Sequence, residues 1–208
     1  SVAAWIRSLP LMMTSTSPGG LLLVMAIMAP VVGILFQFLL GGRFVNRIVI
    51  VTLPDCFVVS AAVFAKIWQS GQPLVYIVGG WQPPLGIALR ADGIAAAMIL
   101  ATAIVICATS IFAWKDFSQP NNTAEARAPF VFWPLLLAIW SALNAIFLSG
   151  DLFNLYVALE LLTFAAVPLV CLKGSAETFK AALRYLLFAL LGSMLYLLGT
   201  ALLYGGYG

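Results

Sequence analysis

Six apolar runs, each long enough to cross a bilayer, constrain this chain more than any other feature. A membrane-spanning helix needs about 20 predominantly apolar residues. The runs are Leu21–Leu40, Ile48–Gln69, Gly93–Trp114, Phe130–Ser149, Leu152–Leu172 and Phe179–Tyr204. Charged residues make up 8% of the chain, against about 25% in soluble domains. We therefore predict an all-α polytopic membrane helix bundle with six transmembrane helices, in which residues 1–208 form a single transmembrane domain.

The distribution of basic residues predicts the orientation of the bundle, because cytoplasmic loops carry an excess of Lys and Arg. If the N-terminus faces outward, the basic residues of the inner segments are Arg43, Arg47, Lys115, Arg127, Lys173 and Lys180. The outer segments then hold only Arg7 and Arg90. This asymmetry predicts that both termini lie outside.

The residue types that bind metals and redox cofactors are scarce. The chain has no His, and its three cysteines, Cys56, Cys107 and Cys171, lie far apart in apolar runs without a CxxC motif. These features argue against a metal, haem or iron–sulfur site, and we interpret the thiols as packing residues. No cofactor and no nucleic-acid partner is expected.

One carboxylate stands near the middle of the fifth apolar run, in "SGDLFNLYVALELLTFAAVPLVCLKG". Glu160 follows Asp151 by nine residues, which places it roughly 13 Å below the outer edge of the membrane. An ionisable group at that depth costs at least about 2–3 kcal/mol and usually faces a partner or a water path. Glu160 is therefore a candidate proton carrier, with Tyr156, one helical turn earlier, as a neighbour. The alternative is a protonated or paired Glu160 that only holds helices together.

Three further charged residues are candidates for the same pathway. Arg184 lies about one and a half turns inside the sixth run, and Lys180 lies one turn earlier on the same face. Both side chains are long enough to reach the membrane interface instead. Asp55 follows Pro54 in the second run, at a depth similar to that of Arg184. It either pairs with Arg184 or is solvated beneath a proline kink.

Three stretches of the chain resemble a known family. "YIVGGWQPPLGIALRADGIAAAM" (Tyr76–Met98), "SGDLFNLYVALELL" (Ser149–Leu162) and "AALRYLLFALLGSMLYLLGTALLYG" (Ala181–Gly205) resemble the D-type component of Mrp-type multisubunit cation/proton antiporters. Proteins of this type are similar to the antiporter-like subunits of respiratory complex I and of membrane-bound hydrogenases. The first two apolar runs agree with this family only in their hydropathy.

The resemblance implies a role for several residues. Glu160 matches the fifth-helix glutamate of the family's proton pathway, and Arg184 matches the basic residue of the sixth helix. Asp92 and Asp151 match positions at outer helix ends, where a structural role is expected. Relatives continue through further helices that supply more pathway residues, so the chain is expected to be a partial copy of the first inverted repeat.

Three functions are compatible with these observations. The first is a proton-translocating subunit of a cation/proton antiporter, with sodium as the expected cation. The second is a proton-pumping subunit of a redox-driven complex of the complex I or hydrogenase type, whose electron carriers would lie in other subunits. The third is a structural or assembly subunit. In each case the chain is not expected to be an enzyme by itself, and it is expected in a bacterial cell membrane with other membrane subunits, lipid and protons as partners.

Overall fold

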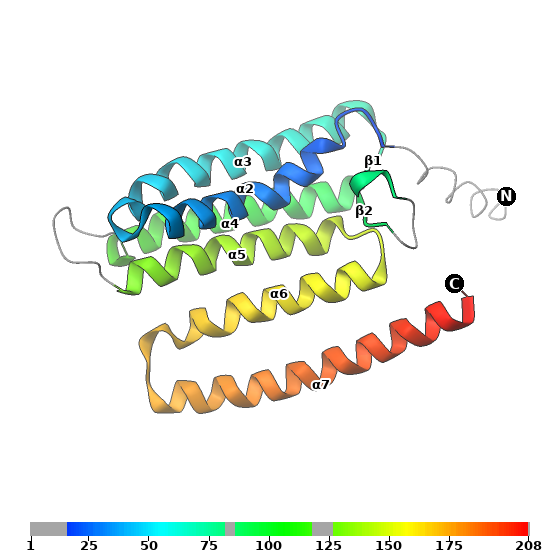
Figure 1. The fold of residues 1–208 in the computed structure, drawn as a ribbon. Coiled ribbons are helices and arrows are strands. Elements are labelled where there is room, and N and C mark those ends of the chain that lie inside the picture. Colours follow the sequence, from blue (N-terminus) through cyan, green and yellow to red (C-terminus); the bar gives the residue numbers. More distant parts are fainter. Residues whose placement is uncertain (1–15, 82–85, 118–126, 208) are drawn as a thin grey trace.

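The computed structural model describes residues 16–81, 86–117 and 127–207, which form a bundle of six long helices (Figure 1). The helices are α2 (Leu21–Leu40), α3 (Val45–Ser70), α4 (Gly93–Phe117), α5 (Arg127–Leu148), α6 (Leu152–Val170) and α7 (Ala176–Tyr207). All six are long and apolar enough to cross a membrane, so the predicted all-α membrane bundle is confirmed. The position of both termini outside stays a prediction, and Arg7, which enters that argument, lies outside the described residues.

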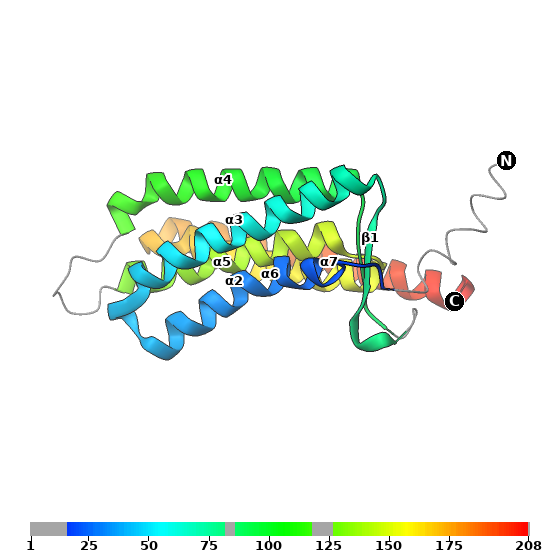
Figure 2. The same cartoon turned by 90° about the horizontal axis from the view of Figure 1, so that it is seen from above.

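A small antiparallel β-hairpin covers one end of the bundle, which we call the hairpin end; the opposite end is the loop end. Strand β1 (Leu74–Ile77) pairs with β2 (Ala88–Ala91), with Val75 opposite Arg90. Figure 2 shows the hairpin crossing the ends of the helices. These strands were not predicted from the sequence, where the segment between the second and third apolar runs is rich in turn and breaker residues.

The hairpin is tied to the bundle on both sides by backbone hydrogen bonds. The Ser17 N–H donates to the Val75 carbonyl at 2.9 Å, beside the start of α2. On the other side, the Gly150 N–H donates to the Ala88 carbonyl at 3.0 Å. A Cβ atom at Gly150 would lie 2.4 Å from that same oxygen, so this close approach requires glycine. The hairpin thereby connects the start of α2 with the turn between α5 and α6.

Helix α5 is the central element of the bundle. It contacts α2, α3, α4 and α6. Of the residues in its membrane-length apolar stretch, 56% are buried. Two polar side chains on α5 reach backbone carbonyls of α2: Asn144 Nδ2 donates to Ala26 at 2.7 Å and Ser141 Oγ donates to Ile27 at 2.9 Å. Interhelical hydrogen bonds of this kind contribute to packing where water is scarce.

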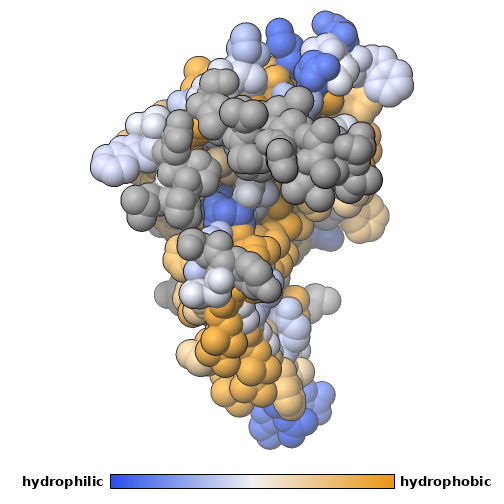
Figure 3. Space-filling model, turned by 90° about the vertical axis from the view of Figure 1, so that its right-hand side faces the viewer, coloured by the Kyte–Doolittle hydropathy of each residue, from blue (hydrophilic) through white to orange (hydrophobic). Residues whose placement is uncertain are grey.

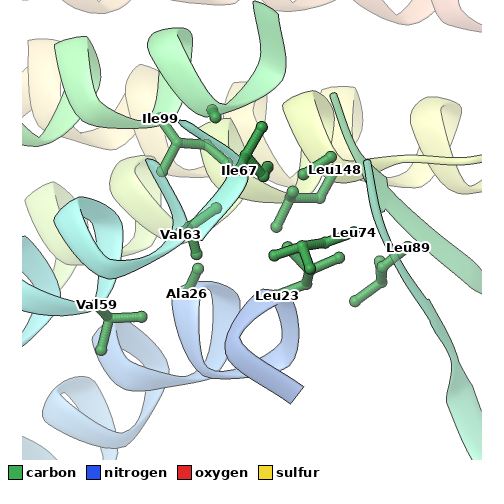
Figure 4. Packing of buried hydrophobic residues seen from close by; sticks show 11 residues of the cluster. Leu23, Ala26, Val59, Val63, Ile67, Leu74, Leu89, Ile99 and Leu148 are labelled. Carbon is green, nitrogen blue, oxygen red and sulfur yellow. The ribbon is translucent and has the colours of Figure 1, made fainter. Parts of the chain in front are cut away.

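The apolar core lies in two clusters along the bundle. Figure 4 shows the cluster at the hairpin end, where side chains of α2, α3, α4 and α5 meet the two strands. Leu23 of α2, Ile99 of α4 and Leu148 of α5 are fully buried in it. The second cluster, toward the loop end, includes Trp133, Leu137 and Trp140 of α5, which are also fully buried. The interface of the strands with the first cluster fixes the hairpin over the helix ends.

Helices α6 and α7 form a separate layer on one flank of the bundle. Helix α6 packs on α5, and α7 packs mainly on α6 (Figure 1). Only 6% of the residues in the membrane-length apolar stretch of α7 are buried. Viewed from the hairpin end, the part of the molecule that contains α7 is narrow and largely hydrophobic (Figure 3). The candidate site therefore lies on the least covered side of the chain.

Candidate functional site

A groove of about 460 Å³ lies between the antiparallel helices α6 and α7 and contains Glu160. Helix α6 lines it with Tyr156, Leu159, Glu160, Leu162, Thr163 and Ala166, and α7 lines it with Tyr185, Ala189, Gly192, Ser193 and Tyr196. Apolar walls with a few hydroxyl groups and one carboxyl group give the groove a mixed character. We call it the Glu160 groove.

The start of α6 determines how deep Glu160 lies. Asp151 Oδ1 accepts a hydrogen bond from the Asn154 N–H at 2.6 Å, which caps the helix, and the Ser149 hydroxyl donates to the Asp151 carbonyl at 2.8 Å. Side-chain capping of this type satisfies a backbone donor that the helix leaves without a partner. Glu160 follows nine residues later, roughly 13 Å along the helix axis. The expected structural role of Asp151 thus has a geometric basis.

The carboxyl group of Glu160 is partly enclosed and chemically unsatisfied. Its Oε1 atom is buried and has no hydrogen-bond partner within the described residues, and the side chain as a whole is partly buried. Buried carboxyl oxygens normally have a partner, which is a protein group, an ordered water or a proton. The Oε1 atom therefore lacks the partner that a buried carboxyl oxygen normally has, and a proton on the carboxyl group would remove the charge that burial disfavours.

Five side chains that carry a hydroxyl group line the same groove: Tyr156, Thr163, Tyr185, Ser193 and Tyr196. Three of them donate to backbone carbonyls: Thr163 to Leu159 at 3.1 Å, Ser193 to Leu190 at 3.1 Å, and Tyr196 to Leu152 at 3.3 Å. Their oxygens can still accept hydrogen bonds. A groove with several such acceptors beside a carboxyl group has the polar partners that ordered water requires.

Tyr156 and Tyr196 hold the two helices together at the end of the groove nearest the hairpin. Their rings stack with centroids 6.3 Å apart and an interplanar angle of 11°. Stacked aromatic pairs add about 0.5–1.5 kcal/mol beyond the area that they bury. The pair therefore sets the spacing of α6 and α7 one turn from Glu160.

The structure brings together two of the five predicted pathway residues. Tyr156 and Glu160 both line the groove, whereas Arg184 and Lys180 are exposed on α7 outside it. Arg184 directly precedes Tyr185, which lines the groove, but Arg184 itself is not part of the lining. Within the described residues, no ion pair joins Glu160 to either cation.

Asp55 lies far from this groove. It is exposed on α3, on the side of the bundle opposite to α7 (Figure 1). The ion pair between Asp55 and Arg184, one of the two sequence-based alternatives, is not formed in this structure. Similar depth in two helices does not make their side chains neighbours, because other helices of the bundle lie between α3 and α7.

Three residues that line the groove from α7 were not predicted as site residues from the sequence. Tyr185, Ser193 and Tyr196 are separated by eight and three residues, which places them on one helical face. Polar groups that recur at this spacing in an otherwise apolar helix are the signal that could have identified them.

Comparisons with known proteins connect the chain to membrane subunits. No protein-family model matches it. It is 31% identical over 146 residues to the D-type component of the Na(+)/H(+) antiporter of Alkalihalophilus pseudofirmus, covering 70% of this chain and 28% of that protein. It is 35% identical over 148 residues to the N-type component of the NADH-quinone oxidoreductase of Desulforudis audaxviator, covering 71% of this chain and 28% of that protein. The chain thus spans less than a third of the length of these curated relatives.

Solved structures show the same fold. The Mrp complex from Dietzia sp. DQ12-45-1b contains a chain with a TM-score of 0.72 and 23% identity, covering 91% of this chain and 35% of that one. A chain of the membrane-bound sulfane sulfur reductase, an archaeal respiratory membrane complex, matches with a TM-score of 0.79 and 24% identity, covering 89% of this chain and 37% of that one. Both likenesses concern the fold.

Proposed function

Because this chain is homologous to part of the antiporter-like membrane subunits, we propose that it belongs to a cation/proton antiporter and carries protons through Glu160. The fold and the antiporter relatives support a multi-pass membrane subunit of this type. Sodium is the proposed cation, because these relatives are named as parts of Na(+)/H(+) antiporters. Other membrane subunits are the proposed partners.

The observation that carries this proposal is the unsatisfied, buried Oε1 atom of Glu160, a residue of a groove that is lined by five hydroxyl-bearing side chains. A carboxyl group near mid-membrane is expensive to ionise in lipid, so such groups usually mark ion or proton pathways. Protonation removes the charge, and deprotonation is assisted by water held among the hydroxyl groups. Alternation between these two states is what proton transfer requires.

Arg184 and Lys180 have a secondary place in this proposal. Both lie on α7 toward the loop end, and both are exposed in the chain as described. In the assembled protein the positive charge of Arg184 would act on the Glu160 groove through water rather than by direct contact. Asp55, on the opposite flank, has no proposed part in the Glu160 groove.

Replacement of Glu160 by Gln in the intact assembly tests the proposal. The change keeps the size of the side chain and removes the exchangeable charge, so sodium-driven proton transport in reconstituted vesicles should be lost while assembly is retained. Glu177→Gln is the matched control, because Glu177 is exposed in the first turn of α7 and lies outside the groove. Wild-type transport by Glu160→Gln would reject the proton-carrier role.

A redox-driven proton pump is the second candidate function. It is favoured by the 35% identity to a component of an NADH-quinone oxidoreductase and by the fold match to a respiratory membrane complex. Flavin or iron–sulfur absorbance that co-purifies with the chain would support this alternative.

A purely structural role of Glu160 predicts a different result for the same variant. Glu160→Gln would then lower the yield of the complex rather than the rate of transport.

A further inference from the structure

A second groove, separate from the Glu160 groove, lies at the hairpin end between α3 and α4. Its volume is about 720 Å³. Phe64, Ile67 and Trp68 of α3 and Ala96 and Ala97 of α4 form its apolar walls. Past the helix ends, its lining becomes polar and includes Arg90 of β2 and Asp92, which precedes α4. The lining of this groove therefore changes from apolar to charged at the ends of the membrane-length helices α3 and α4.

The two charged groups at the polar end remain available for a ligand. Arg90 is partly buried, and neither Arg90 nor Asp92 forms an ion pair with any described residue. Asp92 uses Oδ1 to accept a hydrogen bond from the Ala95 N–H at 2.9 Å, and its second carboxyl oxygen has no such partner in the described ranges. Both residues line the groove, Arg90 from β2 and Asp92 from the position directly before α4.

The apolar end of the groove is open to its surroundings. Trp68 is 79% exposed and stacks on Phe64 with ring centroids 5.9 Å apart. Tryptophan is enriched at the level of the lipid headgroups, where its ring meets both apolar and polar surroundings. An aromatic wall beside two small alanines leaves room for a chain of methylene groups.

We propose that this groove binds a phosphatidylethanolamine molecule. One acyl chain lies along Phe64, Ile67 and Ala97, the guanidinium group of Arg90 binds the phosphate, and the Asp92 carboxylate accepts a hydrogen bond from the ammonium group. Charge complementarity selects this lipid, because an anionic headgroup offers no cation to Asp92 and the quaternary ammonium of phosphatidylcholine has no N–H to donate. The site is independent of the proposed proton transport.

Native mass spectrometry of the intact assembly, titrated with phosphatidylethanolamine, phosphatidylglycerol or phosphatidylcholine, tests the proposal. Wild-type protein should retain phosphatidylethanolamine in preference to the other two lipids. Arg90→Gln should weaken its binding about tenfold, the size expected for one lost charge-assisted hydrogen bond. Lys66→Gln is the control, because Lys66 is exposed on α3 outside the groove and its replacement should leave binding unchanged.

Two further variants distinguish the parts of the site. Asp92→Asn should weaken phosphatidylethanolamine binding about tenfold without weakening phosphatidylglycerol binding, and asparagine preserves the helix cap. Ala97→Leu should narrow the groove and weaken all three lipids, whereas Ala101→Leu, outside the groove, should not. Equal retention of the three lipids, a preference for phosphatidylglycerol, or unchanged binding by both charge variants would overturn the proposal.

Discussion

Asn144 on α5 donates a 2.7 Å hydrogen bond to the backbone carbonyl of Ala26 on α2. That oxygen has no helical donor, because the residue four positions later is Pro30, which lacks an N–H group. One turn away on α5, Ser141 bonds to the next carbonyl, that of Ile27. Pro30 of α2 and the side-chain amide of Asn144 on α5 thus form one packing unit at the centre of the bundle.

Replacing Asn144 by Leu should destabilise the protein by about 1 kcal/mol, the typical size of an interhelical hydrogen bond in a membrane. Thermal unfolding of the purified assembly in detergent measures the change. In a Pro30→Ala background the Ala26 carbonyl regains a helical N–H donor, so the same replacement should cost less. Additive effects of the two substitutions would show that Asn144 does not serve the carbonyl freed by Pro30.

Gly33 should not tolerate a side chain, because a Cβ atom at this position would lie 2.5 Å from Thr52 Cγ2 on α3. We expect Gly33→Ala to cost about 1–3 kcal/mol through overpacking, measured by the same unfolding experiment. Thr52→Ser removes the methyl group and should recover part of this loss. A stability equal to wild type for Gly33→Ala alone would contradict the close packing of α2 on α3.

Gly150→Ala should loosen the hairpin from the turn between α5 and α6. The added Cβ would collide with the Ala88 carbonyl, to which the Gly150 N–H also donates. Amide hydrogen exchange of residues 88–91 should become faster in this variant, while exchange in the middle of α5 stays slow. Unchanged protection of β2 would mean that this contact does not anchor the hairpin.

The helices could be predicted from sequence because their signal is local. The apolar run Leu21–Leu40 coincides with α2, and the run starting at Leu152 coincides with the start of α6. The strands could not, because β1 and β2 have four residues each and are held by contacts with Ser17 and Gly150, which are distant in sequence. Sequence also cannot tell which amide reaches which carbonyl across α2 and α5.

The candidate site was predictable only in part. Glu160 and Tyr156 were identifiable because a charge and its helical neighbours stand out in an apolar run. Tyr196 was not, since its contact with Tyr156 depends on how α7 packs against α6. The separation of Asp55 from Arg184 likewise depends on the order of the helices in space, which depth along each helix does not determine.

Tyr196→Phe should lower proton transport several-fold while the assembly stays intact. The change removes the hydroxyl group of a side chain that lines the Glu160 groove, and with it the bond to the Leu152 carbonyl, but keeps the stacked ring. Transport by reconstituted vesicles is the measurement, and Tyr204→Phe is the control, because Tyr204 is exposed on the same helix beyond the groove. Equal losses in both variants would point to a general effect on α7.

The most direct test of the proposed proton carrier is whether Glu160 itself gains and loses a proton. Infrared difference spectra between acidic and alkaline buffer should show a titrating carboxyl band in the wild type and in Glu177→Gln. If Glu160 carries protons, its contribution to this band disappears in Glu160→Gln. Identical titrating bands in the wild type and in Glu160→Gln would contradict this role.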